Sequence, residues 1–238
     1  MSGSYYIAVT GMRTRLDQLD RVASDIANVS TAGYKAERAT TAEADRPTFG
    51  NTLQSAIDVA NGPVRVDLRS GAITPSSRPL DLAVDGQGFF EIDTPSGPRY
   101  TRDGRFVRGA DSVLATSDGH PVVGTKGTIK LASDDITVDP DGTVRSSGAV
   151  AGTIKLVDFE TPQDLVKEAA DRFMADPATA KAASGTIRSG AVEQANVSVV
   201  DRVAELTTVM RGFEALQRAV SVLANDVDGR AISELGRH

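Results

Sequence analysis

The sequence of 238 residues contains no cysteine and no tryptophan, and aromatic residues make up only 5% of it. Without cysteine the chain can form no disulfide, no thiolate metal site and no cysteine nucleophile. The low aromatic content predicts a lean core, although a hydrophobic content of 40% suffices for one large domain or two modest ones. The absence of cysteine suits an exported protein, and a cytosolic protein that lacks cysteine remains the alternative.

Long apolar runs and a cleavable leader are missing as well. No apolar stretch approaches the roughly 20 residues that a membrane span needs, so we expect no membrane insertion. The first twelve residues contain no basic side chain and no continuous apolar region, which excludes an ordinary secretory signal peptide. The net charge of −6, with its acidic excess within residues 36–195, argues against nucleic acid and anionic membranes as partners.

Apolar residues at alternating spacings of three and four predict a helix at each end of the chain, as in a coiled-coil seam. The N-terminal stripe consists of Val9, Met12, Leu16, Leu19, Ala23 and Ile26. The C-terminal stripe consists of Leu206, Val209, Phe213, Leu216, Val220, Leu223 and Val227. The two stripes could pair within one monomer as a stalk. A second C-terminal stripe comprises Val199, Val203, Leu206, Met210 and Phe213. One partner helix cannot cover both C-terminal stripes, which implies helices from other chains.

The middle of the chain has a period of two, with a turn about every ten residues. Asp-Gly turns recur at residues 103–104, 118–119 and 141–142, between short runs of β-type residues. We therefore expect the α+β class, with terminal helices and a central antiparallel β domain that is sandwich-like or barrel-like. The predicted segments are a helix within 1–35, an extended connector at 36–70 with a short helix at 52–59, a β domain at 71–192 and a C-terminal helix at 193–238. Residues 161–172 could be a short helix or a loop, and Asn196 or Ser198 could cap the last helix.

No set of residues converges on a catalytic, cofactor or metal site. His120 lies in a turn and His238 is the last residue, and neither has ligands at a suitable spacing. Residues 139–142 resemble the start of a calcium loop without its closing glutamate, and residues 85–88 lack the third glycine of a dinucleotide fingerprint. Four nearby carboxylates could suggest a glycosidase pair, but a solvated face explains them more simply; they are Asp81, Asp85, Glu91 and Asp93. We expect no enzyme activity, cofactor or metal.

Four stretches resemble the flagellar axial proteins, the family of the bacterial rod and hook. Residues 26–35 (IANVSTAGYK) match the N-terminal signature of that family without a gap. Residues 80–90 are similar to the start of its β domain and residues 100–106 to its next hairpin. Residues 193–198 and 211–214 are similar to its C-terminal helix. Ser24-Asp25 and Val203 depart from the residues that are usual in the family. The overall length and the short connector resemble the proximal-rod members most.

The resemblance implies a structural subunit whose terminal helices form a coiled-coil inner layer, with the β domain outside. It places the protein in the periplasm-spanning rod of the basal body, where the tube transmits torque and houses the export channel. The implied partners are other proximal and distal rod subunits, further copies of the chain and the flagellar type III export apparatus, with no cleaved signal. The implied interface adds to the two helical stripes the signature residues Asn28, Val29, Gly33, Tyr34 and Asn196. The alternatives are a distal-rod or hook-family protein and, more remotely, a secreted glycan binder or hydrolase with a coiled-coil stalk.

Overall fold

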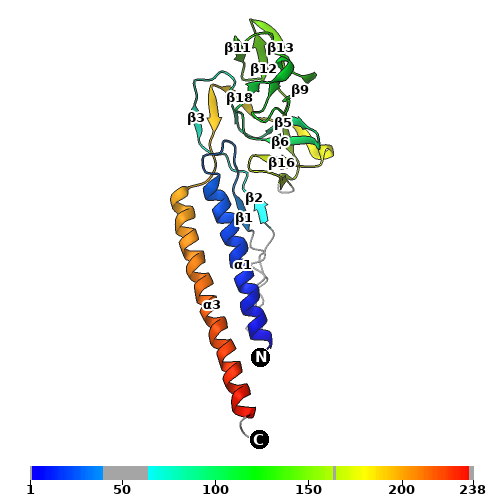
Figure 1. The fold of residues 1–238 in the computed structure, drawn as a ribbon. Coiled ribbons are helices and arrows are strands. Elements are labelled where there is room, and N and C mark those ends of the chain that lie inside the picture. The colour runs from blue at the N-terminus through cyan, green and yellow to red at the C-terminus, as the bar shows by residue number, and fades with distance from the viewer. Residues whose placement is uncertain (1, 40–63, 163–164, 236–238) are drawn as a thin grey trace. The chain divides into compact units, whose positions relative to one another are not determined.

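The computed structural model describes residues 2–39, 64–162 and 165–235, which fall into two compact units. The helical unit comprises the described parts of residues 1–27, 37–64 and 198–238. The β unit comprises residues 28–36 and the described parts of residues 65–197. The predicted α+β class is confirmed, with one long helix at each end of the chain and strands between them (Figure 1).

The helical unit contains α1 (Ser2–Ala27) and α3 (Val199–Leu235), which run antiparallel and side by side (Figure 1). Ser198 is the N-cap of α3, because its hydroxyl accepts a hydrogen bond of 3.4 Å from the backbone N–H of Asp201. The helices come close at Gly11 of α1, where a Cβ atom would lie 3.4 Å from the side chain of Leu216. Among the described residues, neither helix is long and apolar enough to cross a membrane.

The largest sheet of the β unit has six antiparallel strands in the order β15-β16-β6-β5-β14-β17. A tight turn joins its two longest strands, and Phe90 of one is aligned with Thr101 of the other. The strands are β5 (Phe89–Thr94), β6 (Gly97–Thr101), β14 (Leu156–Phe159), β15 (Val166–Lys167), β16 (Arg172–Met174) and β17 (Ala180–Ala182).

Smaller antiparallel sheets complete the β unit. Three strands form one of them, in the order β11 (Ile136–Val138), β12 (Thr143–Ser146) and β13 (Ala149–Thr153). The pairs are β3 (Ile73–Pro75) with β19 (Ala191–Glu193), β4 (Leu82–Asp85) with β18 (Thr186–Ser189), β7 (Val107–Arg108) with β8 (Leu114–Ala115), and β9 (Val123–Gly124) with β10 (Gly127–Thr128). The other short elements are β1 (Glu37–Ala39), β2 (Val64–Val66) and the 3-10 helices η2 (Ala110–Ser112) and η4 (Pro177–Thr179).

Two apolar clusters form the core of the β unit. In the larger cluster the rings of Phe90 and Phe106 meet edge to face with centroids 5.0 Å apart. Its buried members are Leu82, Val84, Phe90, Ile92, Phe106, Leu114, Val122, Ile129, Leu131, Ile136, Val138, Val144, Ile154 and Ile187. The smaller cluster contains Phe89, Tyr100, Val157, Phe159, Leu165 and Phe173. Burial of these side chains, at roughly 1.5–3 kcal/mol each, is the main stabilising contribution within this unit.

The predicted turns are confirmed where hydrogen bonds define them. The N–H of Gly119 donates to the carbonyl of Thr116 at 2.9 Å, and the N–H of Gly142 donates to that of Asp139 at 2.9 Å. A helix over the whole of residues 161–172 is not formed: Pro162 is in a 3-10 helical conformation, and the described part that follows contains β15 and reaches β16. The short helix expected at residues 52–59 lies outside the described residues. Within the β unit, no strand was predicted at β3, β10, β13, β15, β16 or β17.

Candidate assembly surfaces

The face that joins α1 to α3 is largely polar. Asp25 Oδ2 lies 3.0 Å from Arg202 Nε, and the Asp25 side chain is 3% exposed. Gln18 Nε2 donates to Glu205 Oε1 at 3.3 Å. Among the helix side chains that the structure describes, the buried apolar ones are Val22 and Val209. The two helices are therefore held together by ion pairs and hydrogen bonds as much as by apolar packing.

The predicted stripe of α1 lies outside this contact face. Val9 and Leu16 are 43% and 47% exposed, Ala23 is exposed, and Met12, Leu19 and Ile26 are half-buried. At about 100° per residue, the centre of the stripe lies about 120° around the helix from Gln18, Val22 and Asp25. A pairing of the two predicted stripes within one monomer, which the sequence left open, is therefore wrong for α1.

The two predicted stripes of α3 have different surroundings. In the first stripe Val209 is buried and four side chains are half-buried; these are Leu206, Phe213, Leu216 and Val220. Leu216 is the residue that lies beside Gly11 of α1. In the second stripe Val199, Val203 and Met210 are 44%, 47% and 48% exposed. Leu223 and Val227 fall within α3, but their side chains lie outside the described set.

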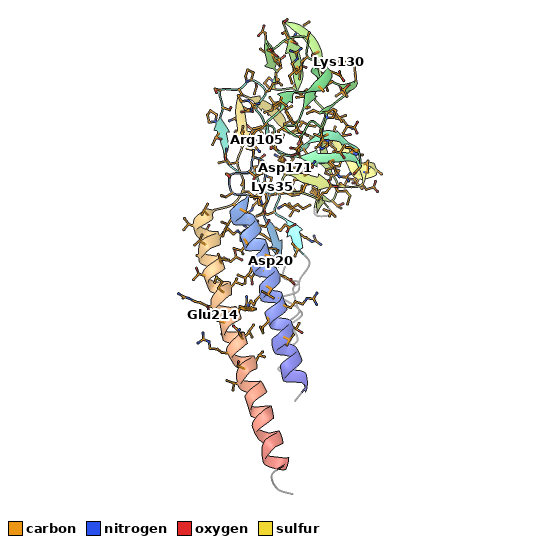
Figure 2. All side chains as sticks on the ribbon, in the orientation of Figure 1. Asp20, Lys35, Arg105, Lys130, Asp171 and Glu214 are labelled. Atoms are coloured by element: carbon orange, nitrogen blue, oxygen red, sulfur yellow. The ribbon has the colours of Figure 1, made fainter. Side chains whose placement is uncertain are left out.

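The exposed apolar residues share the helix surfaces with charged side chains. Glu214 projects from α3 (Figure 2) and pairs with Arg218 at 3.7 Å, one helical turn farther along. The helical unit therefore carries two partly exposed apolar stripes, an α1 stripe at Val9 and Leu16 and an α3 stripe at Val199, Val203 and Met210. Exposed apolar stripes of this kind are typical of surfaces that bind further helices.

The signature residues after α1 belong to the β unit. Asn28 and Val29 are half-buried, and the Asn28 carbonyl accepts a hydrogen bond of 3.0 Å from the N–H of Thr31. Gly33 has φ of +68°, and a Cβ there would lie 2.2 Å from the backbone nitrogen of Asp103, so only glycine fits. The Tyr34 ring is buried, and Lys167 Nζ lies 3.7 Å from its centroid. Gly33 and Tyr34 thus make their contacts within the chain.

Asn196 has a different role from the helix cap that we considered. Its Oδ1 accepts a hydrogen bond of 2.8 Å from the N–H of Ala36. Its Nδ2 donates to the carbonyls of Asp67 at 2.7 Å and Arg69 at 3.1 Å. Asn196 therefore ties together three segments of the β unit, and the cap of α3 is Ser198.

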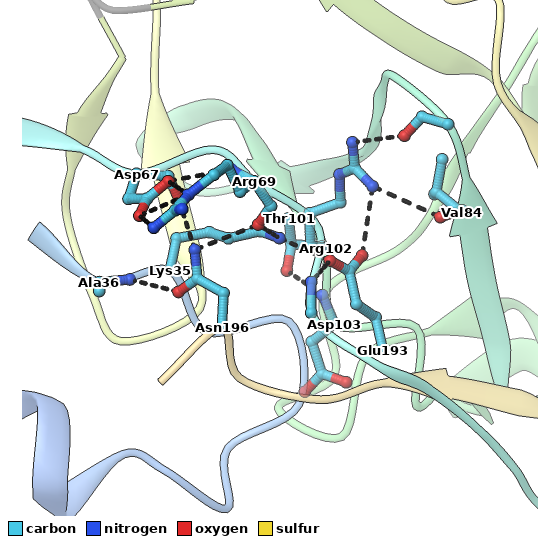
Figure 3. Close-up of polar contacts among 12 residues, drawn as sticks. Lys35, Ala36, Asp67, Arg69, Val84, Thr101, Arg102, Asp103, Glu193 and Asn196 are labelled. Carbon is cyan, nitrogen blue, oxygen red and sulfur yellow. Dashed lines mark hydrogen bonds and ion pairs between the residues drawn. The ribbon is translucent and has the colours of Figure 1, made fainter. Parts of the chain in front are cut away.

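A buried charged cluster that sequence reasoning missed lies beside these residues (Figure 3). Lys35 Nζ is 2.5 Å from Glu193 Oε1, and Arg102 Nη1 is 3.2 Å from Glu193 Oε2. Burial lowers the pKa of Lys35, and the nearby Arg102 charge adds to that shift, although Glu193 opposes it. Burial lowers the pKa of Arg102 as well. The only signal in the sequence was that Lys35 and Glu193 each fall within a stretch that resembles the axial proteins.

The residues weighed for catalysis do not converge in the structure. Asp85 pairs with Arg188 at 2.6 Å, Glu91 pairs with Lys155 at 2.8 Å, and Asp93 is exposed. The prediction of a solvated face is wrong for Asp81, which is 5% exposed and accepts a hydrogen bond of 2.5 Å from the Ser76 hydroxyl. His120 lies in its predicted turn, and His238 lies outside the described residues. Among the described residues, no three His, Cys, Asp or Glu side chains are grouped closely enough to hold a metal ion.

An open groove in the β unit has a volume of about 620 Å³. Its walls come from the β9–β10 turn, the turn at residues 140–141, β14 and β17, and Asp141 is the one carboxylate among its lining residues. The backbone N–H of Thr143 holds the pKa of Asp141 below its usual value. A glycosidase needs two facing carboxyl groups, so this groove does not support the hydrolase alternative.

Two family models match the chain. The model described as "Flagellar hook protein FlgE/F/G D1 domain" matches residues 83–146, which lie in the β unit. The model described as "Flagellar basal body rod FlgEFG protein C-terminal" matches residues 188–233, which include most of α3. The matched regions thus cover both the strands and the C-terminal helix.

Relatives match over nearly the whole length of the chain. The flagellar basal-body rod protein FlgG of Bacillus subtilis is 32% identical over 93% of this chain and 95% of its own length. The rod protein FlgF of Caulobacter vibrioides is 30% identical over 100% of this chain and 99% of its own length. FlgF of Mesorhizobium japonicum is 29% identical over 99% of both chains.

Proposed function

Because this chain belongs to the family of flagellar basal-body rod proteins, we propose that it is a structural subunit of the proximal rod. Its terminal helices polymerise into a helical tube that transmits torque and houses the export channel. The role is structural, without catalysis or a cofactor. Copies of the chain and neighbouring proximal and distal rod subunits are its partners in the periplasm, and the flagellar type III export apparatus delivers it without a cleaved signal.

The observation that carries this proposal is the apolar surface that the helical unit leaves uncovered. Val9 and Leu16 on α1 and Val203 and Met210 on α3 remain more than two-fifths exposed after the helices have packed together. Isolated helices are marginal in water, and burial of an apolar stripe is what stabilises them. Helices of neighbouring subunits would bury these stripes in a coiled-coil inner layer. Contacts of this kind, repeated head to tail with a rotation that does not close on itself, give an open helical assembly.

The proposed interface divides the predicted residues into two groups. The exposed stripe residues contact neighbouring subunits, and the half-buried ones complete the seam; among them are Met12, Leu19 and Ile26. Gly33, Tyr34 and Asn196 serve assembly indirectly, since they anchor the segments next to the helices within the β unit. The β unit, with its own core, forms the outer, sandwich-like or barrel-like layer of the rod.

The length of the chain favours a proximal over a distal position. The FlgF relatives of Caulobacter vibrioides and Mesorhizobium japonicum align over 99% or more of both chains, whereas the Bacillus subtilis FlgG aligns over 93% of this chain and 95% of its own. The FlgG relative has the higher identity, 32%, so a distal-rod subunit is the second candidate.

A deletion strain tests the proposal. We expect non-motile cells whose isolated basal bodies lack the distal rod and hook in electron micrographs, with both defects restored by the gene on a plasmid. Basal bodies that retain the whole proximal rod but lack its continuation would favour the distal candidate. Complete basal bodies with hooks would refute a role in the rod altogether.

A further inference from the structure

The segment that follows α1 and the segment that precedes α3 lie side by side in the β unit. The N–H of Gly33 donates to the carbonyl of Glu193 at 2.8 Å, and the N–H of Asn196 donates to the carbonyl of Tyr34 at 3.3 Å. These backbone contacts hold residues 33–36 against residues 193–196. Both chain segments that connect the β unit with the long helices are therefore fastened to each other.

The side chain of Glu193 is the centre of this junction. It is fully buried, and its Oε1 accepts hydrogen bonds from Lys35 Nζ at 2.5 Å and from the N–H of Gly71 at 2.9 Å. Its Oε2 accepts from Arg102 Nη1 at 3.2 Å. Gly71 must be glycine, because a Cβ there would lie 1.9 Å from the carbonyl oxygen of Gln194. We call Lys35, Gly71, Arg102 and Glu193 the Glu193 latch.

We infer that Glu193 is a positioning residue for assembly, whose carboxylate locks the segment after α1 to the segment before α3. Loss of this contact would leave the β core folded but would release the segment after α1 and the segment before α3 from each other. The assembly part of this inference rests on the proposed rod function, whereas the latch itself is testable in the purified subunit.

The charges of the latch predict an asymmetry between its members. Two buried cations, Lys35 and Arg102, share one buried carboxylate. Removal of Glu193 leaves both buried cations without a directly paired carboxylate, which is strongly unfavourable, whereas removal of Lys35 leaves the matched pair of Arg102 and Glu193. Arg102 also donates hydrogen bonds to the backbone carbonyls of Val84 at 3.4 Å and Gly86 at 2.9 Å, but a carbonyl cannot neutralise its charge.

The experiment measures hydrogen–deuterium exchange by mass spectrometry on the purified full-length chain. In Glu193→Gln, amides of residues 28–36 and 193–197 should exchange at least about tenfold faster, while those of residues 82–92 in the core keep their protection. Lys35→Met should change the exchange less than about threefold. Glu168→Gln is the matched control, because Glu168 also pairs with an arginine, Arg99 at 2.7 Å, but is 40% exposed.

The inference is overturned if Lys35→Met loosens the two segments as much as Glu193→Gln does, or if Glu193→Gln leaves their exchange unchanged. Should Glu193→Gln fail to fold, Glu193→Gln/Lys35→Met replaces it, since it buries one unpaired cation instead of two. That variant should still exchange at least about tenfold faster in these segments than Lys35→Met alone, and equal exchange would refute the latch.

A pH profile adds a readout that depends on the charges of the latch. The groups that act on Lys35 are Glu193 and Asp67, which raise its pKa, and Arg102, which lowers it. Because the net shift is downward from 10.5, the folded chain binds fewer protons than the unfolded chain at pH values just below 10.5. The free energy of unfolding of the wild type should therefore rise relative to that of Lys35→Met as pH increases through this range. A parallel pair of profiles would contradict the downward shift of the Lys35 pKa.

Motility separates a failure of the latch from a failure of the proposed function. If Glu193→Gln loosens the two segments and also abolishes motility with normal subunit levels, both ideas are supported. Loosened segments with normal motility would refute the role of Glu193 in assembly but leave the rod function intact.

Discussion

The β unit and the helical unit use apolar residues in opposite ways. In the β unit, buried aromatic and branched side chains form two closed clusters, and side chains such as Phe90 and Leu82 are completely buried. In the helical unit, Val22 and Val209 are buried, whereas Leu16, Val203 and Met210 remain about half exposed. One unit buries its apolar surface within the chain, and the other presents it outward.

This contrast separates stability from assembly. A unit with a closed core folds without a partner, whereas two helices joined as much by polar contacts as by apolar packing gain most from neighbours that cover their stripes. Substitutions in the two units should therefore have separable effects, on unfolding in the β unit and on polymerisation in the helical unit.

The largest effect is expected from a charge on an exposed stripe. Leu16→Asp or Met210→Asp should abolish motility and incorporation into the rod, because each copy would bury an uncompensated carboxylate against every neighbour. The free energy of unfolding of the purified subunit should change by less than about 0.5 kcal/mol, since both residues are about half exposed in it.

The matched control for this test is Ala215→Asp, which adds the same charge to α3 at an exposed position outside both stripes. It should leave motility intact. Motile cells whose rods contain Met210→Asp would show that the α3 stripe is not an assembly surface, and the comparison between the two units would fail.

In the β unit, the truncation Phe90→Ala should lower the free energy of unfolding by roughly 3–5 kcal/mol, because it leaves a cavity beside Phe106. Denaturant titration followed by tyrosine fluorescence or circular dichroism measures the change. Val150→Ala is the control, since Val150 is 60% exposed and its truncation should change stability by less than about 0.5 kcal/mol. Similar losses from both variants would mean that the β core is not the stabilising element.

An intermediate effect is expected from substitutions in the polar contact between α1 and α3. Asp25→Asn weakens the buried ion pair with Arg202 and should destabilise the helix pair by about 1–3 kcal/mol. Faster hydrogen exchange in α1, with the unfolding midpoint of the β unit unchanged, is the expected result. The exposed pair of Glu214 and Arg218 provides the control, and Glu214→Gln should alter exchange little. Unchanged exchange in Asp25→Asn would show that apolar packing alone joins the helices.

The smallest effect concerns Asp171, which lines a cavity of about 10 Å³ with room for about one water molecule. Burial raises the pKa of Asp171, and the charges of Asp103 and Asp118 raise it further. The folded state then binds more protons than the unfolded state between 3.8 and the raised pKa, so this group's contribution to stability falls as pH rises through that window. Asp171→Asn should stabilise the chain by less than about 1 kcal/mol at neutral pH, and this stabilisation should be absent below pH 3.8. A destabilised variant at neutral pH would contradict this.

Local patterns were enough to predict the elements with strong signals. The heptad spacing predicted both long helices, and the Asp-Gly pairs predicted turns such as that at Gly142. The strands that were missed give weak signals: β17 has only the three residues Ala-Lys-Ala, and β13 is made of small residues and one exposed valine. The stripe of α1 indicated a helix but not which neighbour covers it, because periodicity reveals a face and not its partner.

The candidate site was predictable only in part for the same reason. The residues of the stripes were visible in the sequence, whereas the choice between contacts within the chain and between chains depended on the packing of α1 against α3. The role of Asn196 was missed because an asparagine side chain can either cap a helix or link separate segments, and the sequence does not distinguish the two. Glu193 gave no signal beyond its place in a stretch that resembles the axial proteins, since its partners Lys35 and Arg102 come from distant segments.

The distance along the chain between Lys35 and Glu193, 158 residues, has a consequence for the order of folding. Closing so long a loop early is entropically unfavourable, so local hairpins such as β5–β6 should form first and this junction late. Whichever end of the chain becomes available first, the junction stays open until the other end arrives. Formation of this contact therefore requires a chain that extends at least to Glu193, and a chain truncated before that residue would keep the segment after its first helix unanchored.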